Sequence, residues 1–157
     1  MAIKFSWTVE EVKGGTRFFL SGFITEQSDF SPIVTRAKGW VVLDLAGIDR
    51  INSGGVGAWL SFINGFSAPP REVILDRCSV PMVHQFSMLS NISGRARVRS
   101  VLLPYLCRSC GAEQQLVLDL GAVKTDYKIA EAIECPNCKG QMEFDDLPDS
   151  YLSCFGA

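Results

Sequence analysis

Residues 40–60 read WVVLDLAGIDRINSGGVGAWL, and the predicted fold is built around this stretch. Its first part, 40–45, is a run of apolar and β-branched residues, which predicts a strand covered on both faces at the centre of a sheet. A turn over 46–53 follows. The segment 55–66 then predicts an amphipathic helix, whose apolar face carries Val56, Trp59, Leu60 and Ile63.

The segments on either side extend this unit into a single α/β pattern. Two predicted strands, 5–12 and 16–24, flank Lys13-Gly14-Gly15, a sequence typical of a hairpin turn. A predicted helix over 26–37 ends at Lys38-Gly39. After the helix at 55–66, the pattern predicts a strand, a helix and a strand, over 71–78, 81–92 and 97–106. The order ββαβαβαβ predicts a mixed sheet with right-handed crossovers and with helices packed mainly on one face.

Four cysteines form two Cys-x-x-Cys pairs, Cys107 with Cys110 and Cys135 with Cys138. Zinc prefers four thiolates in a tetrahedron, and two residues between paired cysteines let one tight turn aim both sulfurs at the same point. The spacing therefore predicts one structural zinc ion. A pair of redox dithiols or disulfides is the alternative. A closed four-cysteine site leaves no position for water or substrate, so we expect no catalysis at the metal.

The cysteine pairs predict a division into two domains, a sheet domain over 1–102 and a small zinc ribbon over 103–157. A unit of this size needs a staple such as zinc to fold. Within it we predict strands over 114–120 and 141–144, a short helix over 127–133, and an apolar tail after 145 that docks on the rest of the chain. No flexible linker separates the two domains, so we expect limited freedom between them.

The composition is that of a soluble globular chain, with 157 residues, 47% hydrophobic residues and a formal charge of −2. No leader and no apolar run of about 20 residues are evident, which predicts a cytoplasmic protein without a membrane span. Cys78 is expected in the core and Cys154 in an apolar stretch near the end. Residues 101–157 carry 4 Lys and Arg against 9 Asp and Glu, so nucleic acid is a disfavoured partner for the ribbon, which could serve as an acidic docking surface.

The segment 48–57, with the strand before it and the helix after it, resembles the signature of STAS domains, the sulfate transporter and anti-sigma-factor antagonist family. The resemblance covers about 5–100. In the family's bacterial regulators this turn reads Asp-Ser-x-Gly-Leu-Gly, and a partner kinase that is also the anti-sigma factor phosphorylates the serine. Ser53 matches that serine, Asn52 stands in place of the aspartate, and Val56 stands in place of the leucine.

The resemblance implies a cytoplasmic regulatory module that works by protein binding and signalling rather than turnover. Phosphorylation would add nearly two negative charges at a helix N-terminus and could block docking of the partner. The implied phosphorylation and partner-binding residues are Asn52, Ser53, Gly54, Gly55, Val56 and Gly57.

Three alternatives remain open for this turn. Ser53 or Asn52 could simply cap the helix while the glycines allow close packing. The protein could be a scaffold that self-associates or joins a signalling assembly without phosphorylation, which Asn52 favours. It could instead bind a small ligand or nucleotide at the glycine-rich turn, although the Walker lysine is missing.

An enzyme is the least expected class, because the sequence shows no nucleophile paired with a base. His84, the only histidine, lies on a predicted helix packed in the core and is expected to be structural. Arg95, Arg97 and Arg99 alternate at the start of a predicted strand and are expected to form a solvated face rather than an anion site.

Overall fold

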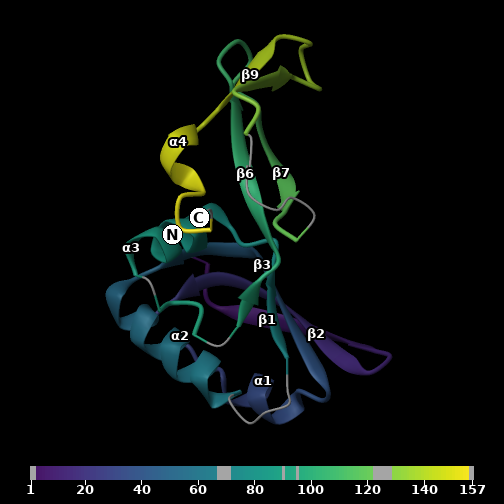
Figure 1. Cartoon of the computed structure of the whole chain (residues 1–157), viewed down its shortest axis with the longest axis vertical. Helices are drawn as coiled ribbons and strands as arrows, with labels where there is room; N and C mark the ends of the chain where they lie inside the picture. The colour runs from purple at the N-terminus through teal and green to yellow at the C-terminus, as the bar shows by residue number, and fades with distance from the viewer. Residues whose placement is uncertain (1–2, 67–71, 90, 95, 122–128, 156–157) are drawn as a thin grey trace.

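The computed structural model of the chain describes residues 3–66, 72–89, 91–94, 96–121 and 129–155, and it has a mixed α/β architecture with two sheets (Figure 1). In chain order, the elements are β1 (Ser6–Val12), β2 (Gly15–Ile24), α1 (Ser31–Arg36), β3 (Trp40–Ile51), α2 (Ser53–Gly65), β4 (Val73–Asp76), α3 (Val80–Met88), β5 (Arg97–Val98), β6 (Ser100–Cys107), β7 (Glu113–Asp119), β8 (Ala132–Glu134), β9 (Gln141–Phe144) and α4 (Pro148–Tyr151).

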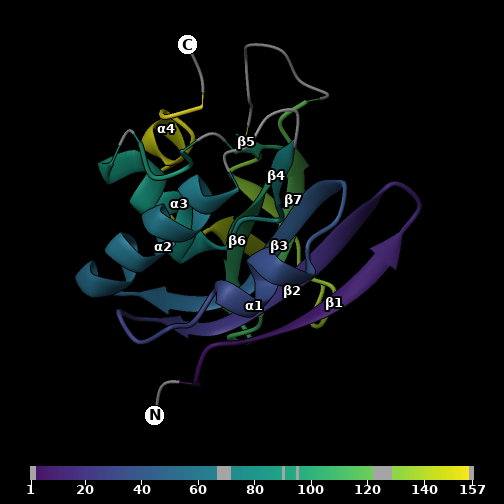
Figure 2. The same ribbon diagram turned by 90° about the horizontal axis from the view of Figure 1, so that it is seen from below.

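The first sheet has the strand order β1-β2-β3-β4-β5. The hairpin partner β1 is antiparallel to β2, as predicted, and the other neighbours are parallel. Alternate residues of β2 and β3, such as Phe18 and Leu43, are fully buried in the same core as Trp59 of α2 and Met82 of α3. This shared core places the helices on one face of the sheet, and Figures 1 and 2 show the arrangement from two sides.

The central strand is longer than predicted. The turn expected over 46–53 is wrong, because β3 continues to Ile51 and stays paired with β2. Two register shifts in that pairing, between Phe19 and Ser21 and between Gly22 and Phe23, absorb the extra residues of β3. The glycine-rich segment that read as a turn is therefore mostly strand and helix, with Asn52 alone between them.

The predicted helices are displaced at their ends. α1 begins at Ser31 rather than near 26, because Thr25 and Ser28 form a local hydrogen-bonded turn and Pro32 suits the first turn of a helix. α2 begins at Ser53, before the predicted start. α3 ends at Met88, short of the predicted 92.

The strand predicted over 97–106 divides between the two sheets. β5 pairs with β4, whereas β6 belongs to an antiparallel sheet of order β7-β6-β9-β8. The predicted boundary between 102 and 103 falls inside β6, whose residues Val101, Leu103 and Tyr105 are buried in the main core. β6 therefore runs from the main core directly to Cys107.

The rest of the C-terminal part follows the sequence prediction except in one segment. Strands are confirmed at β7 and β9. The predicted helix over 127–133 is wrong where it can be judged, since β8 covers Ala132–Glu134, and 127–128 lie outside the described residues. The tail docks as predicted: Tyr151 and Leu152 are buried, and the Tyr151 hydroxyl donates to the Leu102 carbonyl over 2.6 Å.

Candidate functional site

The four predicted metal ligands come together at one point of the second sheet. The Sγ atoms of Cys107, Cys110, Cys135 and Cys138 all lie within 4.8 Å of one another. The Cys107 and Cys138 sulfurs are 3.5 Å apart, and the Cys110 and Cys135 sulfurs are 3.7 Å apart. A tetrahedral ion with bonds of about 2.3 Å to sulfur separates its ligands by about 3.8 Å. The donor set and its spacing therefore suit a metal ion held by four thiolates.

The two cysteine pairs have the same backbone geometry. The N–H of Cys107 donates to the Ala112 carbonyl over 2.8 Å, and the N–H of Cys135 donates to the Gly140 carbonyl over 2.7 Å. A left-handed residue follows each pair, Gly111 at φ 77° and Lys139 at φ 66°. Each turn is thus closed by equivalent hydrogen bonds, which aim the two sulfurs of each pair toward the same point.

The thiols in this cluster differ in acidity. The Asn137 side chain and a backbone N–H donate to Cys110 and lower its pKa to about 6. At Cys138 a backbone N–H from Gly140 favours the thiolate, but the neighbouring sulfurs, that of Cys107 first, outweigh it and raise the pKa to about 12. Several like charges cannot form side by side without a cation, so metal binding would displace protons from the cluster.

The second predicted site lies at the start of α2, where a side-chain cap holds the backbone of the first helical turn. The Oδ1 atom of Asn52 accepts a hydrogen bond from the Gly55 N–H over 2.6 Å, and the first helical bond runs from the Val56 N–H to the Asn52 carbonyl. Asn52, not Ser53, is therefore the cap. Ser53 is the first helical residue and is exposed, so its hydroxyl is accessible to a partner or a modifying enzyme.

Two glycines of the turn are explained by close packing against the end of β2. A Cβ at Gly55 would overlap the carbonyl oxygen of Ile24, and a Cβ at Gly54 would meet the Glu26 carboxylate. Gly57 differs, because nothing lies within 4 Å of the position its Cβ would take. The glycine-rich turn is thus filled by Ile24 and Glu26 at the points where a phosphate-binding loop would need open space.

The two predicted sites lie apart. Figure 1 shows the β9 end of the second sheet, which the cysteines close, at one extreme of the molecule, and α2 against the first sheet near the other. Asn52, Ser53, Gly54 and Gly55 gather at the start of α2, and the side chain of Val56 packs partly against the core. The cysteine cluster and the α2 turn are therefore separate features of the molecule.

His84 lies on a helix packed against the core, as predicted, but its own side chain is at the surface. The side chain is 51% exposed, and Nε2 lies 2.7 Å from Asp146 Oδ2 in the segment before α4. The helical pattern of α3 is correct, but its buried face is formed by Met82, Val83 and Phe86. His84 therefore links α3 to the C-terminal segment.

A cluster of ion pairs on the helix-free face of the first sheet was not predicted. The buried Asp44 accepts from Arg17 over 2.6 Å and from Arg77 over 2.8 Å. Asp76, its neighbour on β4, accepts from Arg17, Arg99 and the Ser100 hydroxyl. The sequence pattern does not predict the ion pairs of these two aspartates, because each lies in a strand of apolar residues at a position where the pattern predicts a core residue.

The arginines that were predicted to form a solvated face therefore have different roles. Arg97 is exposed and pairs with Glu72 over 2.9 Å, Arg99 binds Asp76, and Arg95 lies outside the described residues. The solvated face that we predicted holds for Arg97, and Arg99 instead joins the first sheet to the start of the second.

Lowering the pH is expected to weaken this cluster. Burial alone would raise the pKa of Asp76, but hydrogen bonds from Arg99 and Ser100 and the charges of Arg99 and Arg17 together lower it to about 2. The carboxylate therefore contributes stability above pH 4 that is lost as the pH falls toward 2, about 2 kcal/mol in all. In urea unfolding at a series of pH values, Asp76→Asn should be less stable at neutral pH and show a shallower acid slope.

Ser100→Ala removes one of the hydrogen bonds to Asp76 and should give an acid slope between those of the wild type and Asp76→Asn. An Asp76→Asn slope equal to that of the wild type would show that this carboxyl does not control the acid transition.

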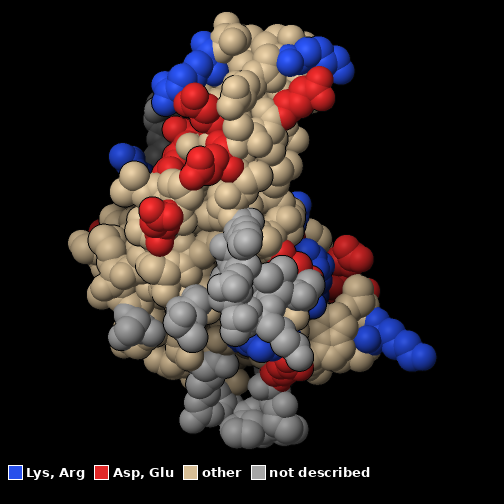
Figure 3. Space-filling model, turned by 45° about the horizontal axis from the view of Figure 1, so that its top comes forward, with Lys and Arg blue, Asp and Glu red and all other residues tan. Residues whose placement is uncertain are grey.

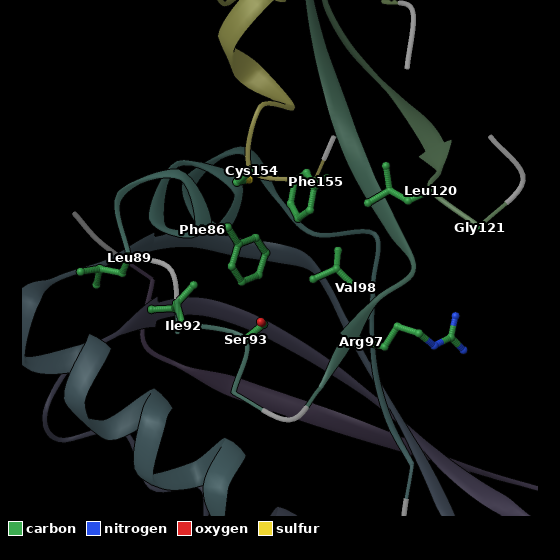
Figure 4. Close-up of a pocket in the computed structure, with 10 residues that line it drawn as sticks. All are labelled: Phe86, Leu89, Ile92, Ser93, Arg97, Val98, Leu120, Gly121, Cys154 and Phe155. Carbon is green, nitrogen blue, oxygen red and sulfur yellow. The ribbon is translucent and has the colours of Figure 1, made fainter. Parts of the chain in front are cut away.

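A hollow of about 340 Å³ separates α3 from the end of the second sheet (Figure 4). Phe86, Ile92, Val98 and Phe155 supply apolar walls, and Ser93 supplies a hydroxyl. In Figure 4 the Arg97 side chain points away from these walls, and it is already paired with Glu72. Among the described residues that line the hollow, Arg97 is the one charged side chain, and it is turned outward.

Comparison of the chain with protein families, with curated proteins and with solved structures gives no match. Within the described residues, no helix combines the length and apolar character that crossing a membrane requires.

The two cysteines outside the cluster lie in different environments. Cys78 is buried in the core, as predicted, and Cys154 is exposed, with its sulfur 3.7 Å from the Ser87 hydroxyl.

Proposed function

We propose that the chain is a cytoplasmic regulatory module of the STAS, anti-sigma-factor antagonist type, which binds a protein partner through the start of α2. The observation that carries this proposal is the exposed Ser53 at the first position of a helix that Asn52 caps. A partner that binds at this turn would contact a surface whose backbone is held in place by Asn52 and Gly55. Phosphorylation of Ser53 would place negative charge on that surface and release the partner.

The order of the first sheet supports the same proposal. An antiparallel edge strand followed by parallel strands, with helices over one face, is the arrangement that the resemblance implies. The α2 turn follows the carboxyl end of β3, which is where open α/β sheets carry their binding residues. None of the described residues at this turn offers a nucleophile with an adjacent base, so we propose binding without turnover.

We propose zinc as the ion of the four-cysteine cluster, in a structural role. Tetrahedral thiolate sites select zinc over magnesium or calcium, which prefer oxygen ligands. Cys107 and Cys135 are buried, and Cys110 and Cys138 are exposed, so the ion would be held at the surface by a closed set of ligands. The metal would stabilise the second sheet and take no part in partner chemistry.

A scaffold that is never phosphorylated is the second candidate, and one observation favours it. The Glu26 carboxylate lies beside Gly54 at the positive end of the α2 dipole. A phosphate on Ser53 would meet this negative charge. In this case Ser53 would belong to a constitutive docking surface for a signalling assembly or a second copy of the chain.

The two candidates differ in how the partner responds to charge at Ser53. Wild type, Ser53→Ala and Ser53→Asp would be used to capture partners from the source cells, with quantitative mass spectrometry of the bound proteins. We expect an ATP-binding kinase partner on wild type and Ser53→Ala, reduced at least about tenfold on Ser53→Asp, a change of about 1.4 kcal/mol.

Ser61→Asp is the matched control, because Ser61 is an exposed serine on the same helix. It should keep the partner. Equal capture by Ser53→Asp and wild type would reject the switch in favour of the scaffold, and no specific partner on any variant would reject both candidates.

A further inference from the structure

The two cysteine turns differ at the third residue of each Cys-x-x-Cys pair, which is Ser109 in the first and Asn137 in the second. The Asn137 side chain reaches across to the first pair, and its Nδ2 donates a hydrogen bond to Cys110 Sγ over 3.5 Å. Ser109 lies beside Gly140, but no hydrogen bond from its hydroxyl to a sulfur is found within the described residues. The side-chain hydrogen bonding of the cluster is therefore unequal between the two turns.

Two of the four sulfurs belong to residues that a reagent in solvent can reach. Cys107 and Cys135 are fully buried, whereas Cys110 and Cys138 are exposed. Figure 3 shows the end of the second sheet as a narrow projection with charged side chains of both signs at its surface. A small reagent that approaches this end from solvent therefore meets Cys110 or Cys138 first.

The two exposed sulfurs differ in the hydrogen bonds that they accept. Each accepts one from the backbone, Cys110 from the Ala112 N–H and Cys138 from the Gly140 N–H over 3.4 Å. Asn137 adds a further donor, and it donates to Cys110. A hydrogen bond to a thiolate stabilises the charge, which lowers its nucleophilicity, and it also orients the sulfur toward a metal. With a metal bound, when all four sulfurs are thiolates, Cys138 is therefore expected to be the more nucleophilic of the two.

We propose that Asn137 is a positioning residue for the ligand Cys110, and that Cys138 is the cysteine that soft carbon electrophiles modify first. In this step the Cys138 sulfur forms a bond to the electrophilic carbon, while the leaving group departs with the electron pair of the bond that breaks. The thioether that results carries no negative charge, so it is a poorer metal ligand than the thiolate. The proposal rests on the zinc site proposed above and does not depend on phosphorylation of Ser53.

Limited alkylation of the full zinc-loaded chain with iodoacetamide, which adds a carbamidomethyl group to sulfur and releases iodide, tests this proposal. The Cys154→Ser background removes the exposed cysteine outside the cluster. Peptide mass spectrometry of the singly modified protein then measures the label on each remaining cysteine. We expect about ten times as much label on Cys138 as on Cys110, the lower end of the usual effect of such hydrogen bonds, because water competes with Asn137 at this exposed site.

Variants at the third residue of each turn identify the cause of the preference. Asn137→Ala should leave Cys110 and Cys138 with comparable label. Asn137→Asp keeps the shape of the side chain but has no N–H to donate, so it should behave in the same way. Ser109→Ala is the matched control, because Ser109 is an exposed residue at the same place in the other turn, and it should keep the preference. A preference for Cys138 that survives Asn137→Asp would overturn the proposal.

Zinc affinity, measured by competition with a chromogenic chelator, gives a second readout. Asn137→Ala and Asn137→Asp should bind zinc about tenfold more weakly, and Ser109→Ala should bind it as wild type does. Far-UV circular dichroism in excess zinc should be unchanged in all three variants, which separates a lost hydrogen bond from a misfolded sheet. Wild-type zinc affinity in Asn137→Ala would reject the positioning role.

The outcomes also separate this proposal from the proposed zinc site. A chain that binds one equivalent of zinc, but takes equal label on Cys110 and Cys138, keeps the zinc site and rejects the role of Asn137. A chain that binds no zinc rejects both. Neither outcome bears on partner binding at the start of α2.

Discussion

Cys135→Ser should lose the bound metal and unfold the end of the second sheet. Cys135 is fully buried, and its backbone closes the second cysteine turn through hydrogen bonds with Gly140 and Lys139. The two strands beside the second cysteine pair, β8 and β9, are short, and β9 joins them to the rest of the sheet by pairing with Tyr105–Cys107. So small a unit could not replace by apolar burial the binding free energy that the proposed zinc ion would supply.

We expect a loss of about 3 kcal/mol or more in the free energy of unfolding, equivalent to a fall of about 10 °C in Tm. Thermal unfolding with metal analysis by mass spectrometry measures both effects. Cys154→Ser is the control, because Cys154 is an exposed cysteine outside the cluster. A Cys135→Ser protein that keeps one equivalent of zinc and the wild-type Tm would contradict the four-cysteine site.

Gly55→Ala should be the most damaging alanine substitution in the α2 turn. The added Cβ would overlap the carbonyl oxygen of Ile24, which is backbone of β2 and cannot rotate away. The helix start would have to move off the sheet and break the hydrogen bond from Gly55 to Asn52. We expect a loss of about 3 kcal/mol in the free energy of unfolding, measured by urea titration, and weaker capture of the α2 partner.

Gly57→Ala on the same helix should instead increase the free energy of unfolding. Nothing lies within 4 Å of its Cβ position, so the substitution gains helix propensity, about 0.5–1 kcal/mol, without a clash. A Gly55→Ala variant as stable as Gly57→Ala would show that the close approach of α2 to β2 is not required.

The parts of the fold that sequence reasoning predicted are those where local pattern and burial agree. The hairpin, the central strand and α2 follow from periodicity, because their apolar residues face one continuous core. The four cysteines converge because two equivalent turns aim them, and the spacing of each pair already implies that geometry.

The failures come from contacts that the periodicity of apolar residues does not reveal, most of them between distant segments and one in a local turn. β3 extends past Leu45 because β2 continues to pair with it through register shifts, which no local pattern reveals. The start of α1 depends on a turn at Thr25 and Ser28. His84 is exposed because the buried face of α3 is set by where the helix packs against β3 and β6. The burial of Asp44 cannot be predicted from the local sequence, because it depends on ion pairs with Arg17 and Arg77 that form only in the folded chain.

The most direct test of the central proposal is the state of Ser53 in the protein purified from its own cells. Intact and native mass spectrometry, with phosphopeptide mapping, would be applied separately to the partner-bound and the free fractions. We predict one zinc ion in both fractions, with phosphate on Ser53 in the free fraction and an unmodified Ser53 in the partner-bound fraction. An unmodified Ser53 in both fractions, or a phosphorylated Ser53 within the complex, would contradict a switch at the start of α2.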